Sequence, residues 1–188
     1  KYYPGKIDKE KLPDSLRVAI RGIGGQGNLF FGRILSHVAM QTPYSKTHIV
    51  KGDTHGMAQL GGSVISTFSC GKVFSSTLAP HSADVLVVME MSEILRPGFL
   101  DLLKPDGTII INIFRVLPVN TKKEAYPDLS KIETFLKGFK LIRIDANQVA
   151  YDLGDKIGRT ANAVVLGVLS NINPFSVIPE GIWLNSLN

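Results

Sequence analysis

Hydrophobic and polar positions along the chain repeat with two different periods, and segments of the two kinds alternate. Short apolar runs bounded by turn residues are typical of buried strands. We expect such strands at 17–21, 47–50, 63–70, 84–89, 108–113 and 140–144. Apolar residues at helical spacing predict helices at 28–40, 129–136, 147–156 and 161–170, with an interrupted helical pattern at 92–103.

Strands that alternate with helices favour an α/β fold, here a Rossmann-like, doubly wound and mostly parallel sheet. Residues 63–76 add a strand, a turn at Gly71 and Lys72 and a short apolar stretch, which predict a β-hairpin inserted after the second strand. Another turn is expected at 104–107. We expect residues 1–15 to be a polar N-terminal extension and 16–188 a single domain, truncated at its C-terminal helix.

A glycine-rich turn follows the first predicted strand directly and opens the first predicted helix. Gly22, Gly24 and Gly27 fit the G-x-G-x-x-G pattern, and Gly25 and Gln26 complete the turn. Backbone N–H groups at a helix N-terminus favour an anion. These five residues are therefore candidates for facing a ligand or a partner, and we expect the Gln26 side chain to brace the turn.

A second glycine-rich segment, at 51–63, follows the second predicted strand and carries polar groups suited to a carboxylate ligand. It holds an imidazole at His55 and an amide at Gln59, and Gly61 and Gly62 permit close approach of another molecule. Ligands of open α/β sheets bind beyond the carboxyl ends of the strands. We therefore expect both glycine-rich segments to open on one shared edge of the sheet.

The position of Asp53 argues against a nicotinamide cofactor. A dinucleotide site requires an acid at a strand tip about 20 residues beyond the glycine turn. Asp53 lies 26 residues beyond Gly27 and is expected within the second glycine-rich segment rather than at the strand end. A self-contained NAD(P) dehydrogenase and a nucleotide-binding regulatory module nevertheless stay open as alternatives.

Taken in order, three motifs resemble the gamma domain of the 2-oxoacid:ferredoxin oxidoreductases. They are Gly-Ile-Gly-Gly-Gln-Gly at 22–27, His-Gly-Met-Ala-Gln-Leu-Gly-Gly-Ser-Val at 55–64 and Ala-Asp-Val-Leu-Val-Val-Met-Glu at 83–90. Gly-Arg-Thr-Ala-Asn at 158–162 extends the resemblance, which is greatest to the indolepyruvate type. Many relatives have arginine where this chain has Leu60, so a contact made by that arginine is not expected here.

The resemblance implies an enzyme component that is inactive when isolated. Such enzymes oxidatively decarboxylate a 2-oxoacid, transfer the acyl group to coenzyme A and pass electrons to ferredoxin. Thiamine diphosphate, Mg²⁺ and iron–sulfur clusters would then be bound by partner subunits or domains, and none by this chain alone. Its own role would be to complete the active site beside the thiamine diphosphate, with His55 and Gln59 nearest the substrate.

The composition of the chain agrees with the assignment of the cofactors to partner subunits or domains. The 188 residues include a single cysteine, Cys70, and four thiolates are needed for a cluster, so the chain cannot bind one alone. We expect Cys70 to be a buried apolar residue and the protein to be cytoplasmic. No spacing of ligands predicts a metal site, the net charge of +5 comes without a nucleic-acid-binding motif, and no apolar run spans a membrane.

Two acidic residues lie at the ends of a predicted strand. Asp84 begins the strand at 84–89 and Glu90 follows it. Carboxylates in such positions accept backbone N–H groups, and we expect both residues to cap neighbouring helices.

Overall fold

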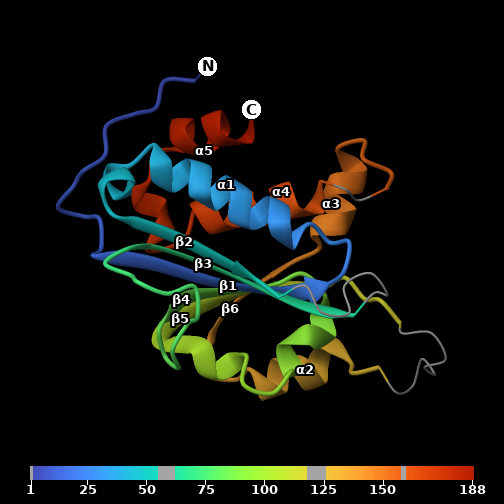
Figure 1. Ribbon diagram of the computed structural model, residues 1–188. Coiled ribbons are helices and arrows are strands. Elements are labelled where there is room, and N and C mark those ends of the chain that lie inside the picture. Colours follow the sequence, from blue (N-terminus) through green and yellow to red (C-terminus); the bar gives the residue numbers. More distant parts are fainter. Residues whose placement is uncertain (1, 55–61, 118–125, 158–159) are drawn as a thin grey trace.

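The computed structural model describes residues 2–54, 62–117, 126–157 and 160–188, which form a sheet covered by helices on both faces (Figure 1). The six strands of the described residues lie in the order β2-β3-β1-β4-β5-β6. Their bounds are β1 Ser15–Ile23, β2 His48–Asp53, β3 Ser63–Gly71, β4 Ala83–Val88, β5 Leu103–Asn112 and β6 Lys140–Ile144. The expected α/β fold is confirmed.

Most of the sheet is parallel, as expected. β4 pairs in parallel with β1 and with β5, and β5 pairs in parallel with β6. β3 is antiparallel to both of its neighbours, β2 and β1. Because β2 and β1 flank β3, they run in the same direction and end at the same edge of the sheet.

The predicted hairpin at 63–76 is wrong in its second half. β3 pairs with the preceding strand β2, from His48 opposite Gly71 to Asp53 opposite Ser66, and residues 72–82 form no strand. Gly71 has φ +99°, and a Cβ there would clash with the backbone of Asp14. The left-handed conformation of Gly71 therefore directs the chain away from the sheet, because only glycine adopts it without strain.

The turn expected at 104–107 is also wrong, because these residues lie inside β5. The pairing of β4 with β5 shifts between Ala83 opposite Leu103 and Val85 opposite Thr108, so the extra residues form a bulge. The interrupted pattern at 92–103 becomes two short 3-10 helices, η3 (Met91–Leu95) and η4 (Leu100–Leu102). Pro97 lies between them, where a continuous helix would lose a backbone hydrogen bond.

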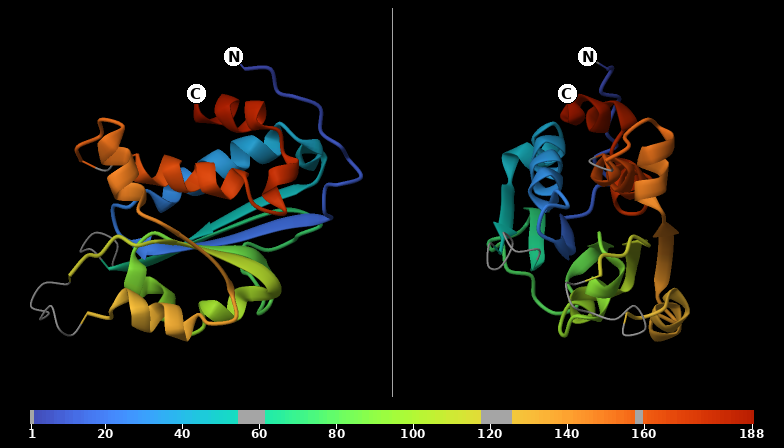
Figure 2. Two further views of the ribbon diagram at one scale, coloured as in Figure 1. Left: turned by 180° about the vertical axis from the view of Figure 1, so that it is seen from behind. Right: turned by 90° about the vertical axis from the view of Figure 1, so that its right-hand side faces the viewer.

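Helices are divided between the two faces of the sheet. One face packs against α1 (Asn28–Met40), α3 (Ala146–Asp152), α4 (Ala161–Ser170) and α5 (Glu180–Leu187), and the other against α2 (Leu129–Phe135), η3 and η4 (Figures 1 and 2). The predicted bounds of α1, α4 and β6 match exactly. Two short 3-10 helices, η1 (Pro43–Lys46) and η6 (Phe175–Val177), lie in connections.

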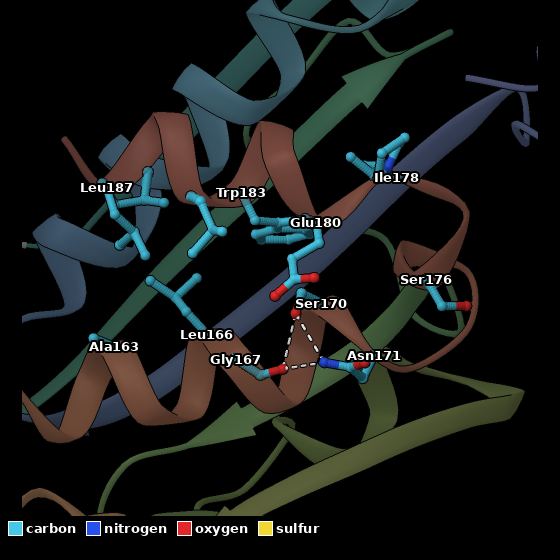
Figure 3. Close-up of a pocket in the computed structure, with 13 residues that line it drawn as sticks. Ala163, Leu166, Gly167, Ser170, Asn171, Ser176, Ile178, Glu180, Trp183 and Leu187 are labelled. Carbon is cyan, nitrogen blue, oxygen red and sulfur yellow. Dashed lines mark hydrogen bonds between the residues drawn. The ribbon is translucent and has the colours of Figure 1, made fainter. Parts of the chain in front are cut away.

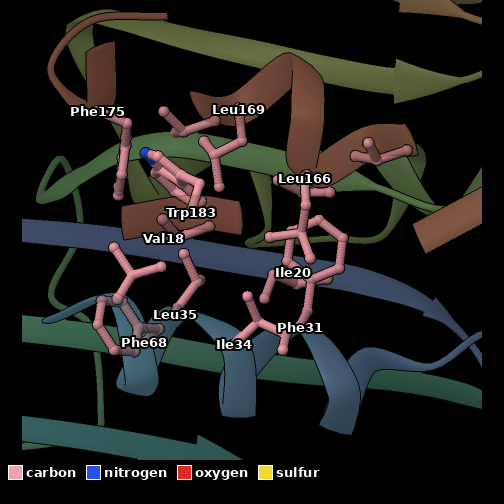
Figure 4. Close-up of a cluster of buried hydrophobic side chains, with 14 of the residues drawn as sticks. Val18, Ile20, Phe31, Ile34, Leu35, Phe68, Leu166, Leu169, Phe175 and Trp183 are labelled. Atoms are coloured by element: carbon pink, nitrogen blue, oxygen red, sulfur yellow. The ribbon is translucent and has the colours of Figure 1, made fainter. Parts of the chain in front are cut away.

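The larger hydrophobic core lies between the sheet and the α1, α4 and α5 helices. Side chains from β1, such as Val18 and Ile20, meet Phe31 of α1, Leu166 of α4 and Trp183 of α5 (Figure 4). All of these side chains are buried, which accounts for the continuous apolar character of the strands. This packing holds the first residue of α1 in a fixed place beside the carboxyl end of β1.

The N-terminal residues run beside the C-terminal helix. The backbone N–H of Tyr2 donates to Asn185 Oδ1, and Asn185 Nδ2 donates back to the carbonyl of Tyr2, both at 2.8 Å. Figure 1 accordingly places the two ends of the chain close together. Among the described residues, no helix has the length and apolar character that crossing a membrane requires.

Cys70 supplies a prediction about stability at alkaline pH. The residue is buried in β3, and burial raises the pKa of its thiol to about 12. In the unfolded chain the thiol ionises near pH 8.5, so the folded state retains the proton that the unfolded state loses. We expect the free energy of unfolding to fall between pH 9 and 10 with a slope approaching about 1.4 kcal/mol per pH unit from this residue.

Chemical denaturation of the wild type and Cys70→Ala across this interval measures that slope. The variant is expected to be less stable at pH 8 because of the lost packing, yet to lose less stability than the wild type from pH 9 to 10. Equal slopes would contradict the assignment.

Candidate functional site

The two glycine-rich segments meet at one edge of the sheet, as their positions after β1 and β2 predict. The backbone N–H of Gly24 donates to the carbonyl of Gly62 at 3.0 Å. Thr54 N–H donates to the carbonyl of Ile65 at 3.0 Å, which extends the pairing of the second segment with β3. His55, Gln59 and Gly61 lie outside the described residues, so their predicted roles stay predictions.

Asp53 is the last residue of β2 and not part of a loop, which corrects the expectation from the sequence. β2 is longer than predicted because its pairing with β3 continues through Lys51 and Gly52. Its carboxylate lies 3.4 Å from Lys51 Nζ. Asp53 therefore lies at a strand end, where a dinucleotide site has its acidic residue. Its position no longer argues against dinucleotide binding, and the remaining argument comes from the structure of the glycine turn.

The sheet has its switch point between β1 and β4, because the chain leaves β1 toward β2 and leaves β4 toward β5 on the opposite side. Such a crevice is where open α/β sheets bind nucleotides. Here the Gln26 side chain spans it. Ile23 N–H donates to Gln26 Oε1 at 2.8 Å, and Gln26 Nε2 donates to the carbonyl of Met89 at 3.1 Å. The expectation that Gln26 braces the turn is confirmed.

Two glycines of the motif are explained by protein packing. A Cβ on Gly22 would lie 2.6 Å from Gln26 Oε1 and 3.0 Å from Met89 Cβ. Gly27 has φ +80°, and a Cβ there would clash with the amide of Asn162 in α4. Contacts with the chain's own amide groups thus account for the absence of a side chain at these two positions.

A pocket of about 260 Å³ opens beside the turn, lined by residues 23–29, Asp53, Thr54 and Val64. Asn28, the first residue of α1, is only 5% exposed, and its Nδ2 donates to the carbonyl of Val64 at 3.4 Å. Among the described residues, its buried Oδ1 has no hydrogen-bond partner. α1 has no side-chain cap at Gly27, so its first-turn N–H groups are also available at this edge.

A buried charged cluster at the same end of the sheet carries no sequence signal. Glu93 of η3 is 1% exposed, and its carboxylate accepts from Arg21 Nε and from Arg96 Nε, each at 3.1 Å. The Ser63 hydroxyl also donates to Glu93. Together these contacts join β1, β3 and η3. The residues come from three distant parts of the chain, and no local pattern brings these parts together.

Of the two carboxylates expected to cap helices, one does so. Glu90 is buried and accepts the Ser92 N–H at 3.0 Å at the start of η3, and it also accepts from Val116 N–H and the Tyr126 hydroxyl. Burial and Glu90 raise the pKa of the Tyr126 hydroxyl. Asp84 is not a helix cap: it accepts the Arg17 N–H at 2.7 Å.

Asp84 also pairs with the Lys104 ammonium group, within the bulge of β5. Because β1, β4 and β5 are neighbours in the sheet, the carboxylate links adjacent strands rather than ending a helix. Its role is therefore structural and lies at the sheet edge opposite the glycine turn.

A second cavity, of about 440 Å³, lies between α4 and α5 (Figure 3). Leu166 and Trp183 contribute its apolar lining, and Glu180 is the charged residue that faces it. It contains none of the residues predicted as functional. Among the described residues, no cluster of three or more histidine, cysteine or acidic side chains is suited to a metal ion.

Comparison with known proteins identifies the family. Residues 17–184 match the model of the family described as pyruvate ferredoxin/flavodoxin oxidoreductase. The chain is 31% identical over 158 residues to indolepyruvate oxidoreductase subunit IorB of Archaeoglobus fulgidus, covering 82% of this chain and 75% of that relative. The chain therefore belongs to the pyruvate ferredoxin/flavodoxin oxidoreductase family, and the expected assignment as an oxidoreductase component is confirmed.

Solved structures share the fold. Pyruvate oxidoreductase subunit PORC of Thermotoga maritima superposes with a TM-score of 0.63 at 21% identity, covering 90% of this chain and 82% of that one. The 2-oxoglutarate:ferredoxin oxidoreductase of Magnetococcus marinus, solved with 2-oxoglutarate, coenzyme A and succinyl-CoA, gives 0.63 at 19% identity. That match covers 94% of this chain and 27% of the longer one, so the same fold occurs there within a larger chain.

The bridged switch point predicts weak affinity for dinucleotides. We expect calorimetric titration of the chain with NAD and NADP to give no micromolar binding, because the Gln26 side chain bridges the crevice between Ile23 and Met89. Micromolar binding of either cofactor would contradict this and favour the dehydrogenase alternative.

The Gln26 bridge also predicts a stability effect. Gln26→Ala leaves the Ile23 N–H and the Met89 carbonyl with fewer partners, and we expect the free energy of unfolding to fall by about 1–3 kcal/mol. Gln148→Ala is the matched control, because its amide pairs with Asp152 on the exposed surface of α3 at 2.7 Å. That change should cost less than about 0.5 kcal/mol. Similar losses in both variants would show that the bridge adds nothing specific.

Proposed function

We propose that this chain completes the active site of a 2-oxoacid:ferredoxin oxidoreductase of the indolepyruvate, or arylpyruvate, type. The reaction is oxidative decarboxylation of the 2-oxoacid to an acyl-coenzyme A, with the electrons passed to ferredoxin. The curated relatives favour this substrate class, because those of about 30% identity are indolepyruvate oxidoreductase subunits.

The observation that carries the proposal is the hydrogen bond between the two glycine-rich segments at the carboxyl edge of the sheet. It joins Gly24 to Gly62 at 3.0 Å and so fixes the two ends of one continuous surface. The nucleotide crevice beneath is bridged by Gln26. An edge that lacks side chains at Gly24 and Gly25 and has a bridged crevice is suited to contact with a partner protein.

The chemistry of the reaction then belongs to the partner. A single buried cysteine cannot hold a four-thiolate cluster, so the iron–sulfur clusters are assigned to partner subunits or domains. Thiamine diphosphate and Mg²⁺ are proposed to bind there as well. Coenzyme A enters as co-substrate. The residues of this chain contribute shape, exclusion of water and hydrogen-bond donors at the shared surface.

His55 and Gln59 are the proposed donors. They follow Thr54, which lies at the edge pocket, and precede Gly62, which is bound to the glycine turn. A protonated imidazole and an amide N–H are both suited to the carboxylate of a 2-oxoacid. The segment that carries them therefore starts and ends at the proposed contact surface.

The two alternatives from the sequence are less well supported. A nucleotide-binding regulatory module and an NAD(P) dehydrogenase both need the switch-point crevice, and Gln26 spans it with hydrogen bonds to β1 and to Met89. The relatives also belong to a different class of oxidoreductase.

Purification of the native complex through a tag on this chain tests the proposal. We expect a thiamine diphosphate-binding, cluster-containing subunit to co-purify, and the complex to reduce ferredoxin with indolepyruvate or phenylpyruvate in preference to pyruvate and 2-oxoglutarate. The chain alone is the control and should be inactive. A complex that prefers 2-oxoglutarate would contradict the substrate class, and the absence of a thiamine-dependent partner would contradict the function itself.

Substitution of the proposed donors tests their role within that complex. His55→Ala and Gln59→Ala should each lower kcat/KM for the preferred 2-oxoacid by roughly tenfold to a hundredfold, since a charge-assisted hydrogen bond contributes about 1.5–3 kcal/mol. His37→Ala is a matched control, because His37 is exposed near the far end of α1. Unchanged kcat/KM values in an intact complex would show that the segment carrying His55 and Gln59 has only a structural role.

A further inference from the structure

A cleft of about 470 Å³ lies on the face of β2 and β3 that α1 does not cover. Ile65 and Thr67 of β3, Gly52 of β2 and Thr54 just after β2 line it, and the chain after β3 crosses beside them at 76–78. Thr67 Oγ1 donates to the carbonyl of Ser76 at 2.6 Å, which fixes this crossing segment on the sheet. Pro97, Gly98, Phe99 and Leu102 line the opposite side.

Gly52 permits the crossing segment to approach the sheet. A Cβ on Gly52 would lie 2.9 Å from both Ser76 Cβ and Thr67 Oγ1. Any other residue would therefore push the segment outward and change the shape of the cleft. The cleft is thus a built feature of the fold and not a gap between loops.

Arg21 places a cation in this cleft. Its side chain is 18% exposed, its Nε donates to Glu93 Oε2 at 3.1 Å and to Ser63 Oγ at 3.2 Å, and its guanidinium carbon lies 5.5 Å from the centre of the Phe99 ring. These contacts fix the plane of the guanidinium. Within the described part of the chain, the Nη1 and Nη2 groups make no hydrogen bond, so both keep donors for a ligand.

The charges around the cleft select the ligand. Arg21 and Arg96 both contact the Glu93 carboxylate, so this group of three carries one net positive charge. Asp53 also lines the cleft and pairs with Lys51 at 3.4 Å, which adds no net charge. One net positive charge favours a monoanion over the dianion of a phosphate monoester. The second negative charge of the dianion would lie near the Asp53 and Glu93 carboxylates, with no cation to balance it.

The walls add a second requirement. Ile65, Pro97 and Leu102 present partly exposed apolar surface, Leu78 and Phe99 are buried in the wall, and Thr67 and Ser76 carry polar groups. A carboxylate matches the fork of donors on a guanidinium, and an apolar body would cover the aliphatic part of the wall. We propose that this cleft binds a small monocarboxylate with an apolar body, through Arg21. The cleft shares Asp53 and Thr54 with the pocket beside the glycine turn, but binding in it does not depend on the proposed function.

Titration of the full chain with phenylacetate tests the proposal, because this probe has the carboxylate and an apolar ring but no reactive 2-oxo group. Ligand-detected and amide-detected NMR should give saturable binding, with shift changes at Ile65, Leu78 and Phe99. Acetate should bind more weakly because it lacks the ring, and inorganic phosphate should leave these amides unchanged. Binding of phenylacetate confined to other residues, or no saturable binding, would overturn the proposal.

Variants separate the roles of the cation and the walls. Arg21→Gln should weaken phenylacetate binding by roughly tenfold to a hundredfold. Arg143→Gln is the matched control: Arg143 pairs with Glu133 away from the Glu93 group, does not line the cleft and should leave the affinity unchanged. Thr77→Trp narrows the cleft without changing the ion pairs and should abolish phenylacetate binding. This variant tests the site even if Arg21→Gln does not fold. Equal affinity in Thr77→Trp and the wild type would contradict the site.

Discussion

The amide of Gln26 is the contact on which the arrangement of the candidate site depends. It accepts from the Ile23 N–H and donates to the Met89 carbonyl, and so joins the ends of β1 and β4 where the sheet changes direction. In a fold of this class the crevice between such strands is open to a nucleotide. Here the Gln26 side chain bridges that crevice, and a pocket of about 260 Å³ opens beside the turn.

The rest of the edge follows from this bridge. With Gln26 folded back over Gly22, the turn presents mainly backbone, and Gly24 is free to hydrogen-bond Gly62 from the second glycine-rich segment. Asn162 of α4 packs against Gly27 from the other side, which couples the final helices to the start of α1. Core packing between β1, α1, α4 and α5 keeps this geometry rigid, because closely packed interiors leave little freedom for the elements to shift (Figure 4).

Sequence patterns predict the helices and strands of this fold better than they predict which strands pair. The glycine turn and the bounds of α1 are predicted correctly because strand, turn and helix depend on local sequence and residues 28–40 have clear helical spacing of apolar side chains. The hairpin prediction is wrong because strand pairing depends on residues far away in the sequence: β3 pairs with β2 and β1, and Gly71 at φ +99° ends it. The role of Gln26 could be anticipated from its place in the turn, but its bond to Met89 spans 63 positions.

The charged cluster around Glu93 cannot be predicted from local sequence patterns. Arg21 ends a strand and Glu93 lies in a broken helical pattern, so each reads as an ordinary surface residue in the sequence. Only the parallel pairing of β1 with β4 brings η3 beside β1, and burial then requires the carboxylate to have cationic partners. A cleft bounded by such a cluster is a property of topology, and it has no signature in any single segment.

If the edge formed by the glycine turn and Thr54 faces the catalytic partner, its backbone amides are protected from solvent in the complex. Hydrogen–deuterium exchange of this chain, alone and within the purified complex, measures this protection directly. Slower exchange in the complex is predicted for peptides covering 22–31 and 53–64, with no change at the opposite edge around Gly71 and Lys72. Unchanged exchange at 22–31, with protection confined to the opposite edge or to α5, would contradict the account.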